Sequence, residues 1–354
     1  MPEIASPFKI TCHKEKLESY LRNESIFPAT LEFDLTSVCN RKCPDCPSTT
    51  SLPSKTLETD FIERLFSLLE GQTRGLLLTG GEPTMAPTFP EALRLARKHG
   101  FVDVVVVTNG TFLNEAKVAS ALLTYASAVR VSLYDWSTES CGGLHPTLKR
   151  IEALRSRIDQ EGSKLQIGVS ALTSKKNAKG LSAVTQEVAS AGGHWIYFHP
   201  LCTKWETGSP SRVDQKGVLN KIEECQASQP DGFRVFAFHD RYMENKIEFN
   251  GYHSAHFLLV VGADGMNYLG AEVKYQRQHI IADVAGNWRN DFLWQSERLQ
   301  RIQAVSSKTY SAIGSRHRGV LYNSLVEQLM QRGQKAADGS LPFSRDEFLF
   351  PHIL

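Results

Sequence analysis

The sequence predicts an α/β protein: a partial (β/α)6 TIM-like barrel followed by a small α+β C-terminal extension. Two observations lead to this fold class. Six short apolar runs of strand length alternate with amphipathic stretches of helix length. Such β-then-α units imply a parallel sheet with outer helices, and six units are too few to close a full TIM barrel. The predicted strands cover residues 29–35, 75–80, 103–109, 128–134, 165–172 and 194–201.

Helix signals lie between these strands. The stretch "TDFIERLFSLLEG" begins at a Thr-Asp cap at residue 59 and ends at Gly71. The stretch "TFPEALRLARKHG" ends in the same way at Gly100. Residues 147–162 and 178–193 show the same period and the same glycine stop, so each is predicted to be an outer helix.

The alternation of strand and helix signals ends after the sixth predicted strand. We expect an N-terminal leader segment over residues 1–28, the barrel over 29–204 and the extension over 205–354. Within the extension, "FRVFAFH" (233–239) has the pattern of a strand. The stretch "HFLLVVGADGMNYLGAE" predicts a hairpin whose two strands join at Ala-Asp-Gly.

Charge and hydropathy restrict the partners. The 354 residues carry a net charge of +2, so there is no basic field for nucleic acid. No apolar run is long enough to cross a membrane, and the N-terminus has no signal-peptide pattern. Because clustered cysteines in such a chain indicate metal binding or catalysis rather than disulfides, we predict a cytoplasmic protein.

Three cysteines crowd the segment "TSVCNRKCPDCPS", directly after the first predicted strand. Cys39, Cys43 and Cys46 form CxxxCxxC at the carboxyl end of that strand, where barrel folds place their chemistry. Structural zinc sites and most iron–sulfur clusters take more than three protein ligands. Three thiolates would leave one iron open to bind a ligand, which favours a catalytic cluster. A disulfide, or zinc with a distant further ligand, remains an alternative.

The motif, its spacing and its position resemble the radical S-adenosylmethionine (SAM) superfamily. The resemblance implies that Cys39, Cys43 and Cys46 hold a [4Fe–4S] cluster whose open iron binds SAM. It further implies reductive cleavage of SAM to a 5′-deoxyadenosyl radical, which takes a hydrogen atom from the substrate. The turn "GGEP" after the second strand is similar to the family element that holds the methionine amine of SAM. It contributes Gly80, Gly81, Glu82 and Pro83.

Further cofactor contacts follow from the same resemblance. Asn109 and Ser132, at the ends of the third and fourth strands, resemble the family positions that touch the ribose and carboxylate of SAM. Ser170, together with Tyr197 or His199, is expected to complete the adenosine pocket. The family usually has an aromatic residue before the third cysteine. This chain has Asp45 there, so its adenine contact must differ, through backbone groups.

The extension is similar to the SPASM or twitch region of many family members. In those proteins a cysteine after the hairpin binds an auxiliary cluster, but this chain has Gly270 there and no cysteine after Cys225. His253 and His256 offer nitrogen ligands in principle, although packed histidines are more common. A degenerate extension argues against two-electron oxidation. It favours dehydration, decarboxylation or epimerisation, the reactions of a lyase-type enzyme in antibiotic or related natural-product biosynthesis.

The predicted substrate is a polar small molecule: a sugar, aminoglycoside or nucleoside intermediate. Candidate catalytic residues lie in and before the loop after the sixth strand. His199 and Glu206 offer acid–base groups, Cys202 a thiol hydrogen donor and Tyr134 a further hydroxyl. Secondary candidates are Lys204, Trp205, Asp135, His239 and Asp240. The resemblance implies an electron-donor partner of the flavodoxin or ferredoxin type, and neither nucleic acid nor membrane is an expected partner.

Two other functions are compatible with the sequence. A peptide-modifying radical SAM enzyme usually carries an N-terminal winged-helix module, and the roughly 28 residues before the first strand are too few for one. A non-enzymatic iron–sulfur or zinc protein would use the same cysteines for structure alone. Both remain alternatives at this point.

Overall fold

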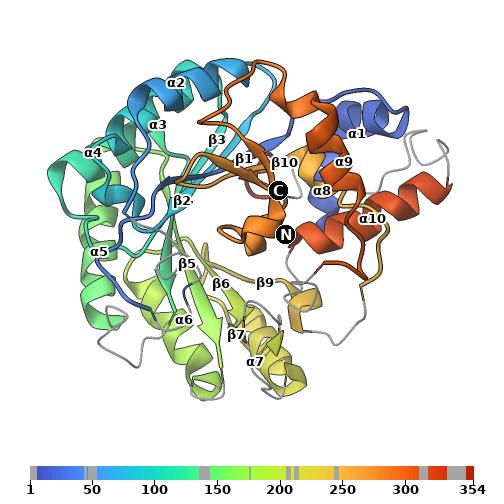
Figure 1. Ribbon diagram of the computed structural model, residues 1–354. Coiled ribbons are helices and arrows are strands. Elements are labelled where there is room, and N and C mark those ends of the chain that lie inside the picture. The colour runs from blue at the N-terminus through green and yellow to red at the C-terminus, as the bar shows by residue number, and fades with distance from the viewer. Residues whose placement is uncertain are drawn as a thin grey trace.

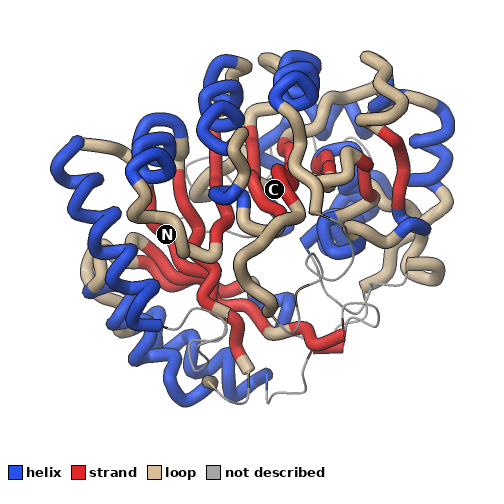
Figure 2. The backbone as a smooth tube through the Cα atoms, turned by 60° about the vertical axis from the view of Figure 1, so that its left-hand side comes forward, coloured by secondary structure: helices blue, strands red, loops and turns tan. Residues whose placement is uncertain are grey.

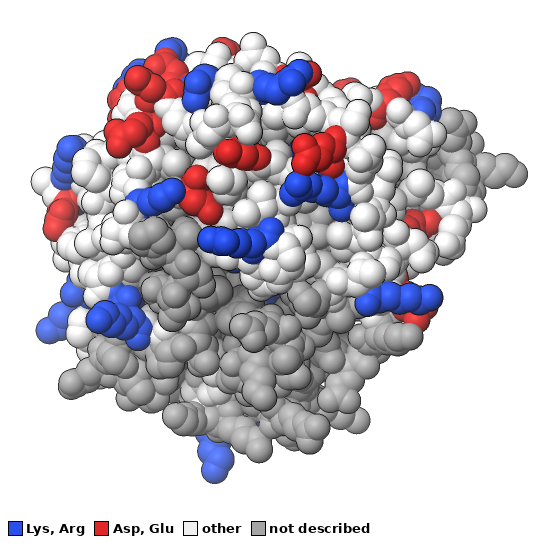
Figure 3. Space-filling view, viewed as in Figure 1, with Lys and Arg blue, Asp and Glu red and all other residues white. Residues whose placement is uncertain are grey.

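The computed structural model describes most of the chain. It covers residues 6–43, 46, 54–134, 144–174, 177–204, 209–210, 215–242, 247–310, 318–332 and 348–354. Figure 1 shows a curved sheet with helices arranged around its outer side. Figure 3 shows charges of both signs scattered over the visible described surface, in keeping with a net charge near zero.

The predicted fold class is confirmed. All six predicted barrel strands are present, and each is parallel to the next. They belong to a ten-stranded sheet in the order β12-β11-β10-β1-β2-β3-β4-β5-β6-β9. The barrel strands are β1 (Thr30–Thr36), β2 (Gly75–Gly80), β3 (Asp103–Thr108), β4 (Ala128–Leu133), β5 (Gln166–Thr173) and β6 (Trp195–Pro200).

Helices cover one face of this sheet (Figure 2). On β1, Leu31, Phe33 and Leu35 belong to the large apolar core beneath the helices. Glu32 and Asp34 alternate with them and therefore point to the opposite, inner face. The outer helices are α2 (Thr59–Leu68), α3 (Phe89–Lys98), α4 (Ala116–Tyr125), α5 (Leu144–Glu161) and α6 (Leu181–Ser190). Helix α4 was not among the helices predicted from the sequence.

The sheet continues beyond the six predicted units. After the short ribbon β7 (Cys202–Lys204) and β8 (Ser209–Pro210), α7 (Gln215–Ala227) leads to β9 (Arg234–Ala237), which is parallel to β6. The strand predicted at 233–239 is therefore real, and it extends the barrel sheet. The division at residue 204 remains a prediction, because the sheet is continuous across it.

The hairpin predicted in the extension is also confirmed. Strands β10 (Leu258–Val261) and β11 (Met266–Tyr268) are antiparallel, and Gly265 takes a positive φ of 78° in their turn. β10 is parallel to β1, so the extension joins the barrel sheet directly. The remaining elements are β12 (Ile280–Asp283) and the helices α8 (Ser254–Phe257), α9 (Ser296–Gln303) and α10 (Arg318–Arg332).

Short 3-10 helices connect several elements. They are η1 (Pro7–His13), η2 (Pro83–Met85), η4 (Ala178–Gly180), η5 (His239–Tyr242), η6 (Ala271–Val273), η7 (Arg277–His279) and η8 (Phe292–Trp294). The N-terminal η1 is followed by α1 (Lys14–Leu21). No helix in the described ranges is long and apolar enough to cross a membrane.

Residues 348–354 fill the amino end of the barrel. The hydroxyl of Thr30, the first residue of β1, donates to the His352 carbonyl (2.5 Å), and the Leu354 amide donates to that hydroxyl (3.0 Å). Asp103, at the start of β3, accepts from the His352 amide (2.8 Å). Ile353 packs in an apolar cluster with residues 77, 105 and 128. The amino ends of the strands are therefore covered, and the polar groups at their opposite, carboxyl ends are the candidates for a site.

Candidate cofactor-binding site

The three cysteines of the predicted motif follow β1 at the carboxyl end of the sheet. Cys39, Cys43 and Cys46 are partly exposed and form no disulfide. The Cys46 amide donates to the Cys43 carbonyl (3.2 Å), while the Cys39 sulfur accepts from the Arg41 amide (3.4 Å). Burial raises the pKa of the Cys39 thiol, and the Arg41 amide partly opposes that rise. Among the described residues, no three cysteine, histidine or carboxylate groups form a ready-made metal cage.

The glycine turn after β2 packs against the start of the cysteine loop. The Gly81 amide donates to the Thr36 carbonyl (2.7 Å), and the Glu82 amide donates to the Val38 carbonyl (2.8 Å). A Cβ on Gly80 would lie 2.3 Å from the Thr36 oxygen, and one on Gly81 would lie 2.3 Å from the Val38 oxygen. Both distances are far below van der Waals contact, so this turn requires glycine. The turn and the cysteine loop thus form one tightly joined backbone unit.

Glu82 is buried beneath this unit and accepts four hydrogen bonds. Its Oε1 accepts from the Thr84 amide (3.2 Å), the Thr84 hydroxyl (2.5 Å) and the Thr108 hydroxyl (2.6 Å). Its Oε2 accepts from the Asn109 amide (2.6 Å). A carboxylate oxygen can accept more than one hydrogen bond, so Oε2 retains capacity for a ligand donor. Pro83 is the first residue of η2 and fixes the chain as it leaves the turn.

Sequence reasoning missed Thr84 and Thr108 as partners of Glu82. Each threonine lies beside a predicted site residue, in "GGEPT" and in "VVVVTNG", which is the only sequence signal for them. Their hydroxyls fix the carboxylate and connect β2 to β3. The two threonines therefore hold the buried Glu82 side chain in place.

Asn109 lies beside the cysteine loop. Its Nδ2 donates to the Asn40 side chain (2.8 Å) and makes a longer contact with the Cys39 sulfur (3.8 Å). Its Oδ1 accepts from the Thr111 amide (2.9 Å), which holds the amide group in place. The ends of β1, β2 and β3 thus meet around Cys39, as expected for parallel strands. The predicted ribose contact of Asn109 remains a prediction.

The other predicted cofactor residues form a row across the sheet. Ser132 on β4 is the register partner of Ser170 on β5, which is in turn the partner of Tyr197 on β6. Tyr197 stacks on His199, with ring centroids 5.1 Å apart. The sequence interpretation named Tyr197 and His199 as alternatives, and the structure brings both together.

Tyr134 reaches the same aromatic group. Its ring lies edge-on to His199, with centroids 6.3 Å apart. Burial raises the pKa of the Tyr134 hydroxyl, a hydrogen bond with Ser132 opposes the rise, and the nearby thiols of Cys46 and Cys43 add to it. Tyr134 therefore lies close to Ser132 and His199.

Several predicted residues cannot be placed beside this group. Asp45, Asp135, Trp205 and Glu206 lie outside the described residues. The structure describes only the backbone of Cys202 and Lys204 in β7, and of Asp240 in η5. His239 begins η5, after β9. The catalytic roles suggested for these residues remain predictions.

The position predicted to lack an auxiliary-cluster cysteine is occupied by a different network. A Cβ on Gly270 would lie 2.3 Å from the Tyr252 hydroxyl. That hydroxyl donates to Glu272 (2.6 Å), as does the hydroxyl of Tyr310 (2.5 Å). The space beside Gly270 is thus filled by tyrosine side chains.

The two histidines of the extension are packed. His253 contacts the Tyr20 hydroxyl through Nδ1 (2.7 Å) and Glu327 through Nε2 (3.3 Å). Burial lowers the pKa of His256 to about 3, with the positive charge of Arg298 adding to the shift. Both therefore have the surroundings of packed histidines.

Part of the chain resembles known proteins. Residues 34–160 match the family model of the Radical SAM superfamily. The chain is 37% identical over 82 residues to a 7,8-dihydro-6-hydroxymethylpterin dimethyltransferase of Methanocaldococcus jannaschii, covering 22% of this chain and 16% of that protein. It is also 37% identical over 84 residues to a GTP 3',8-cyclase of Chlorobaculum tepidum, covering 23% and 25%. The matches thus span a quarter or less of these relatives.

Solved structures share the fold over most of the chain. Streptococcus suis SuiB bound to its precursor peptide SuiA has a TM-score of 0.63 at 14% identity, covering 86% of this chain and 73% of that one. Native anSMEcpe with bound AdoMet and the Cp18Cys peptide has a TM-score of 0.57 at 17% identity, covering 88% and 99%. At these identities the likeness concerns the fold alone. Residues 34–160 thus resemble the radical SAM superfamily, whose members use a [4Fe–4S] cluster and S-adenosylmethionine.

Proposed function

We propose that this chain is a radical SAM enzyme that reductively cleaves S-adenosylmethionine and takes a hydrogen atom from a polar small-molecule substrate. The observation that carries the proposal is the joining of the cysteine loop to the glycine turn at the carboxyl ends of β1 and β2. Three thiols suit a cluster with one open iron, and the glycine turn that docks on their loop brings the Glu82 carboxylate beside it.

The chain's own residues then have distinct tasks. Cys39, Cys43 and Cys46 would hold the cluster, and their loop would have to tighten as the metal binds. The remaining hydrogen-bonding capacity of the Glu82 carboxylate, which follows the Gly80–Gly81 turn packed on the cysteine loop, suits the ammonium group of the methionine part. Asn109, Ser132 and Ser170 offer hydrogen bonds to the rest of the cofactor. Bound there, the cluster and SAM supply the 5′-deoxyadenosyl radical that abstracts hydrogen.

The substrate class follows from the polar row and from the extension. Ser132, Ser170, Tyr197, His199 and Tyr134 present hydroxyl and imidazole groups along neighbouring strands. Such groups suit a hydroxylated molecule such as a sugar, aminoglycoside or nucleoside intermediate. Both curated relatives are named for small polar compounds, a pterin and GTP.

The reaction type follows from the degenerate extension. Without an auxiliary cluster as electron acceptor, dehydration, decarboxylation or epimerisation is favoured, and His199 and Tyr134 are the described acid–base candidates. We place the enzyme in natural-product biosynthesis in the cytoplasm, with an electron donor of the flavodoxin or ferredoxin type. The division into a leader, barrel and extension is part of the same proposal.

The direct test is anaerobic reconstitution of the full chain with iron and sulfide. We expect about four iron atoms per chain, and 5′-deoxyadenosine formation from SAM after reduction with dithionite. A variant with Cys39, Cys43 and Cys46 changed to alanine should show neither result. One zinc per chain and no cleavage would instead support the structural-metal alternative and overturn the proposal.

Peptide modification is the second candidate, because SuiB and anSMEcpe carry peptides in their solved structures. Polyhydroxylated small molecules and cysteine-containing peptides should be compared under identical reducing conditions. Small molecules should raise 5′-deoxyadenosine formation above the background without substrate. If only peptides do so, the small-molecule assignment is wrong and the second candidate replaces it.

A further inference from the structure

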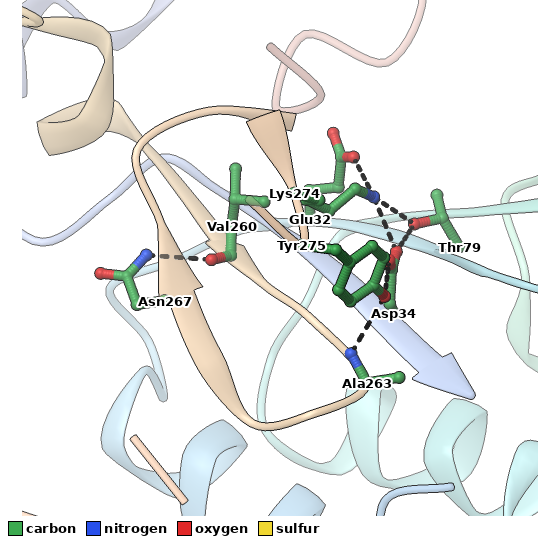
Figure 4. Close-up of polar contacts among 8 residues, drawn as sticks. All are labelled: Glu32, Asp34, Thr79, Val260, Ala263, Asn267, Lys274 and Tyr275. Atoms are coloured by element: carbon green, nitrogen blue, oxygen red, sulfur yellow. Dashed lines mark hydrogen bonds and ion pairs between the residues drawn. The ribbon is translucent and has the colours of Figure 1, made fainter. Parts of the chain in front are cut away.

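We infer that two residues of the extension, Lys274 and Tyr275, act as positioning residues for the cofactor-binding turn. They form a buried cluster with Glu32 and Asp34 of β1 and Thr79 of β2, which we term the clasp (Figure 4). The inference rests on the proposed function and adds to it a role for the extension in cofactor binding.

The Lys274 ammonium group has three acceptors within the clasp. Its Nζ donates to Glu32 (2.9 Å) and Asp34 (2.8 Å) and makes a longer contact with the Thr79 hydroxyl (3.5 Å). An ammonium group has three donors, so these contacts occupy all of them. The Lys274 side chain is 13% exposed and Asp34 is fully buried, so water competes little for these contacts.

Tyr275 holds the other oxygen of Asp34. Its hydroxyl donates to Asp34 Oδ2 (2.5 Å) and accepts from the Ala263 amide (3.2 Å) in the loop between β10 and β11. Its φ of 70° lies in the left-handed region, which bulky side chains rarely adopt. A backbone conformation of this kind persists only where the surroundings impose it. Here the surroundings are the contacts that bring the Lys274–Tyr275 turn against β1.

The clasp lies next to the cofactor-binding turn along the chain. Thr79 donates to Asp34 and immediately precedes Gly80. The register between β1 and β2 shifts between Asp34 and Thr36, so the clasp sits at the irregularity. Just after this irregularity, the Thr36 carbonyl accepts from the Gly81 amide (2.7 Å). The turn that contains Gly81 also contacts the start of the cysteine loop.

These contacts form a short physical connection from the extension to the site. Lys274 and Tyr275 fix Asp34, and Asp34 fixes Thr79 and the strand irregularity. That irregularity sets the position of the Thr36 carbonyl, against which the glycine turn docks. Release of Asp34 should therefore loosen the turn without changing any group proposed to touch the cofactor.

The test compares two tyrosines that make the same hydrogen bond in different places. Tyr275→Phe removes a 2.5 Å bond to Asp34, whereas Tyr310→Phe removes a 2.5 Å bond to Glu272 in the core of the extension. We expect Tyr275→Phe to speed amide exchange of the 79–85 segment by roughly tenfold in cluster-free protein. In reconstituted full-length protein the Kd for SAM should weaken by roughly tenfold. Tyr310→Phe should leave both quantities unchanged.

Thr79→Val provides a second variant of nearly unchanged size, in case Tyr275→Phe fails to fold. It should also speed exchange in 79–85. If Tyr275→Phe or Thr79→Val exchanges like Tyr310→Phe, the clasp only packs the molecule and the inference is wrong. Because exchange is read without cluster, it decides this inference separately. Failure of the wild-type protein to bind a cluster or cleave SAM would overturn the proposed function instead.

Discussion

Glu82 in the barrel and Glu272 in the extension are both buried carboxylates, but their donors differ. Glu82 accepts from the amides of Thr84 and Asn109 and from the hydroxyls of Thr84 in η2 and Thr108 at the end of β3. Glu272 accepts from the hydroxyls of Tyr252 and Tyr310, whose rings pack in the apolar core of the extension. Glu82 therefore organises backbone around a site, whereas Glu272 satisfies the polar ends of core side chains.

The comparison shows that the burial of a carboxylate does not by itself indicate its function. A buried carboxylate needs hydrogen-bond donors wherever it lies, so a hydrogen-bond network around it does not by itself indicate a functional site. The origin of the donors is more informative. The backbone donors of Glu82 come from η2 and from the end of β3 and hold the turn that is proposed to bind the cofactor, whereas the donors of Glu272 come from aromatic side chains of the core.

The largest effect is expected for Glu82→Gln compared with Glu272→Gln. The glutamine amide nitrogen cannot accept a hydrogen bond, so at position 82 it would face donors that have lost their acceptor. We expect Glu82→Gln to weaken SAM binding about 100-fold and to lower the free energy of unfolding by ~2–3 kcal/mol. Titration calorimetry and urea denaturation measure these quantities. Glu272→Gln should lose stability alone, and equal losses of SAM binding in the two variants would contradict the comparison.

A second pair of variants adds a methyl group in each region. In Gly81→Ala the new Cβ meets the Val38 and Ser37 carbonyl oxygens at 2.3 and 2.7 Å, and these are backbone atoms of the cysteine loop. We expect about 10-fold weaker SAM binding and incomplete cluster loading. In Gly270→Ala the Cβ meets the Tyr252 hydroxyl, so thermal stability should fall while iron content stays normal. Reduced iron content in Gly270→Ala would show that the two regions are not independent.

A smaller effect is expected for Tyr252→Phe. This change removes one of the two hydroxyl donors of Glu272 and leaves the ring in place. The free energy of unfolding should fall by about 1–2 kcal/mol, measured by urea denaturation, because the remaining donor still satisfies the same oxygen. The rate of 5′-deoxyadenosine formation should not change. A loss of that rate without a loss of stability would assign Tyr252 a functional role.

The smallest effect concerns pH and His256. Burial lowers the pKa of His256 to about 3 in the folded protein, whereas an unfolded histidine titrates near its ordinary value of about 6.5. Between these values the unfolded chain binds the extra proton, so stability is full above about pH 6.5 and falls as pH decreases. We expect a loss of about 1 kcal/mol between pH 7 and pH 5.5. His256→Gln should remove this part of the pH dependence, and an unchanged slope would refute the assignment.

The elements set by local pattern could be predicted from sequence. The six barrel strands and the hairpin at Ala-Asp-Gly followed from apolar runs bounded by turn residues. Helix α4 was missed, although its stretch "AKVASALLTY" is mostly apolar and small. The parallel pairing of β9 with β6 was missed for another reason: it depends on how the intervening ribbon and helix fold back.

The candidate site also has parts that could be predicted from the sequence and parts that could not. The cysteines and the glycine turn lie in short motifs, so their neighbourhood follows from the rule that parallel strands end at one edge. The clasp could not be predicted, because Lys274 lies 242 positions from Glu32 in the sequence. Nothing in a lysine–tyrosine pair indicates which distant carboxylates it will meet. Only the pairing of β10 with β1 brings them together.

The segment over residues 348–354 has a consequence for the order of folding. Thr30 on β1 is bonded to His352 and Leu354, which lie 322 and 324 positions further along the chain. During synthesis, β1 to β6 therefore emerge long before the residues that occupy their amino ends. The nascent barrel must keep an unfilled apolar floor at Leu77, Val105 and Ala128 until Ile353 arrives. Over that interval this apolar surface is open to aggregation or chaperone binding.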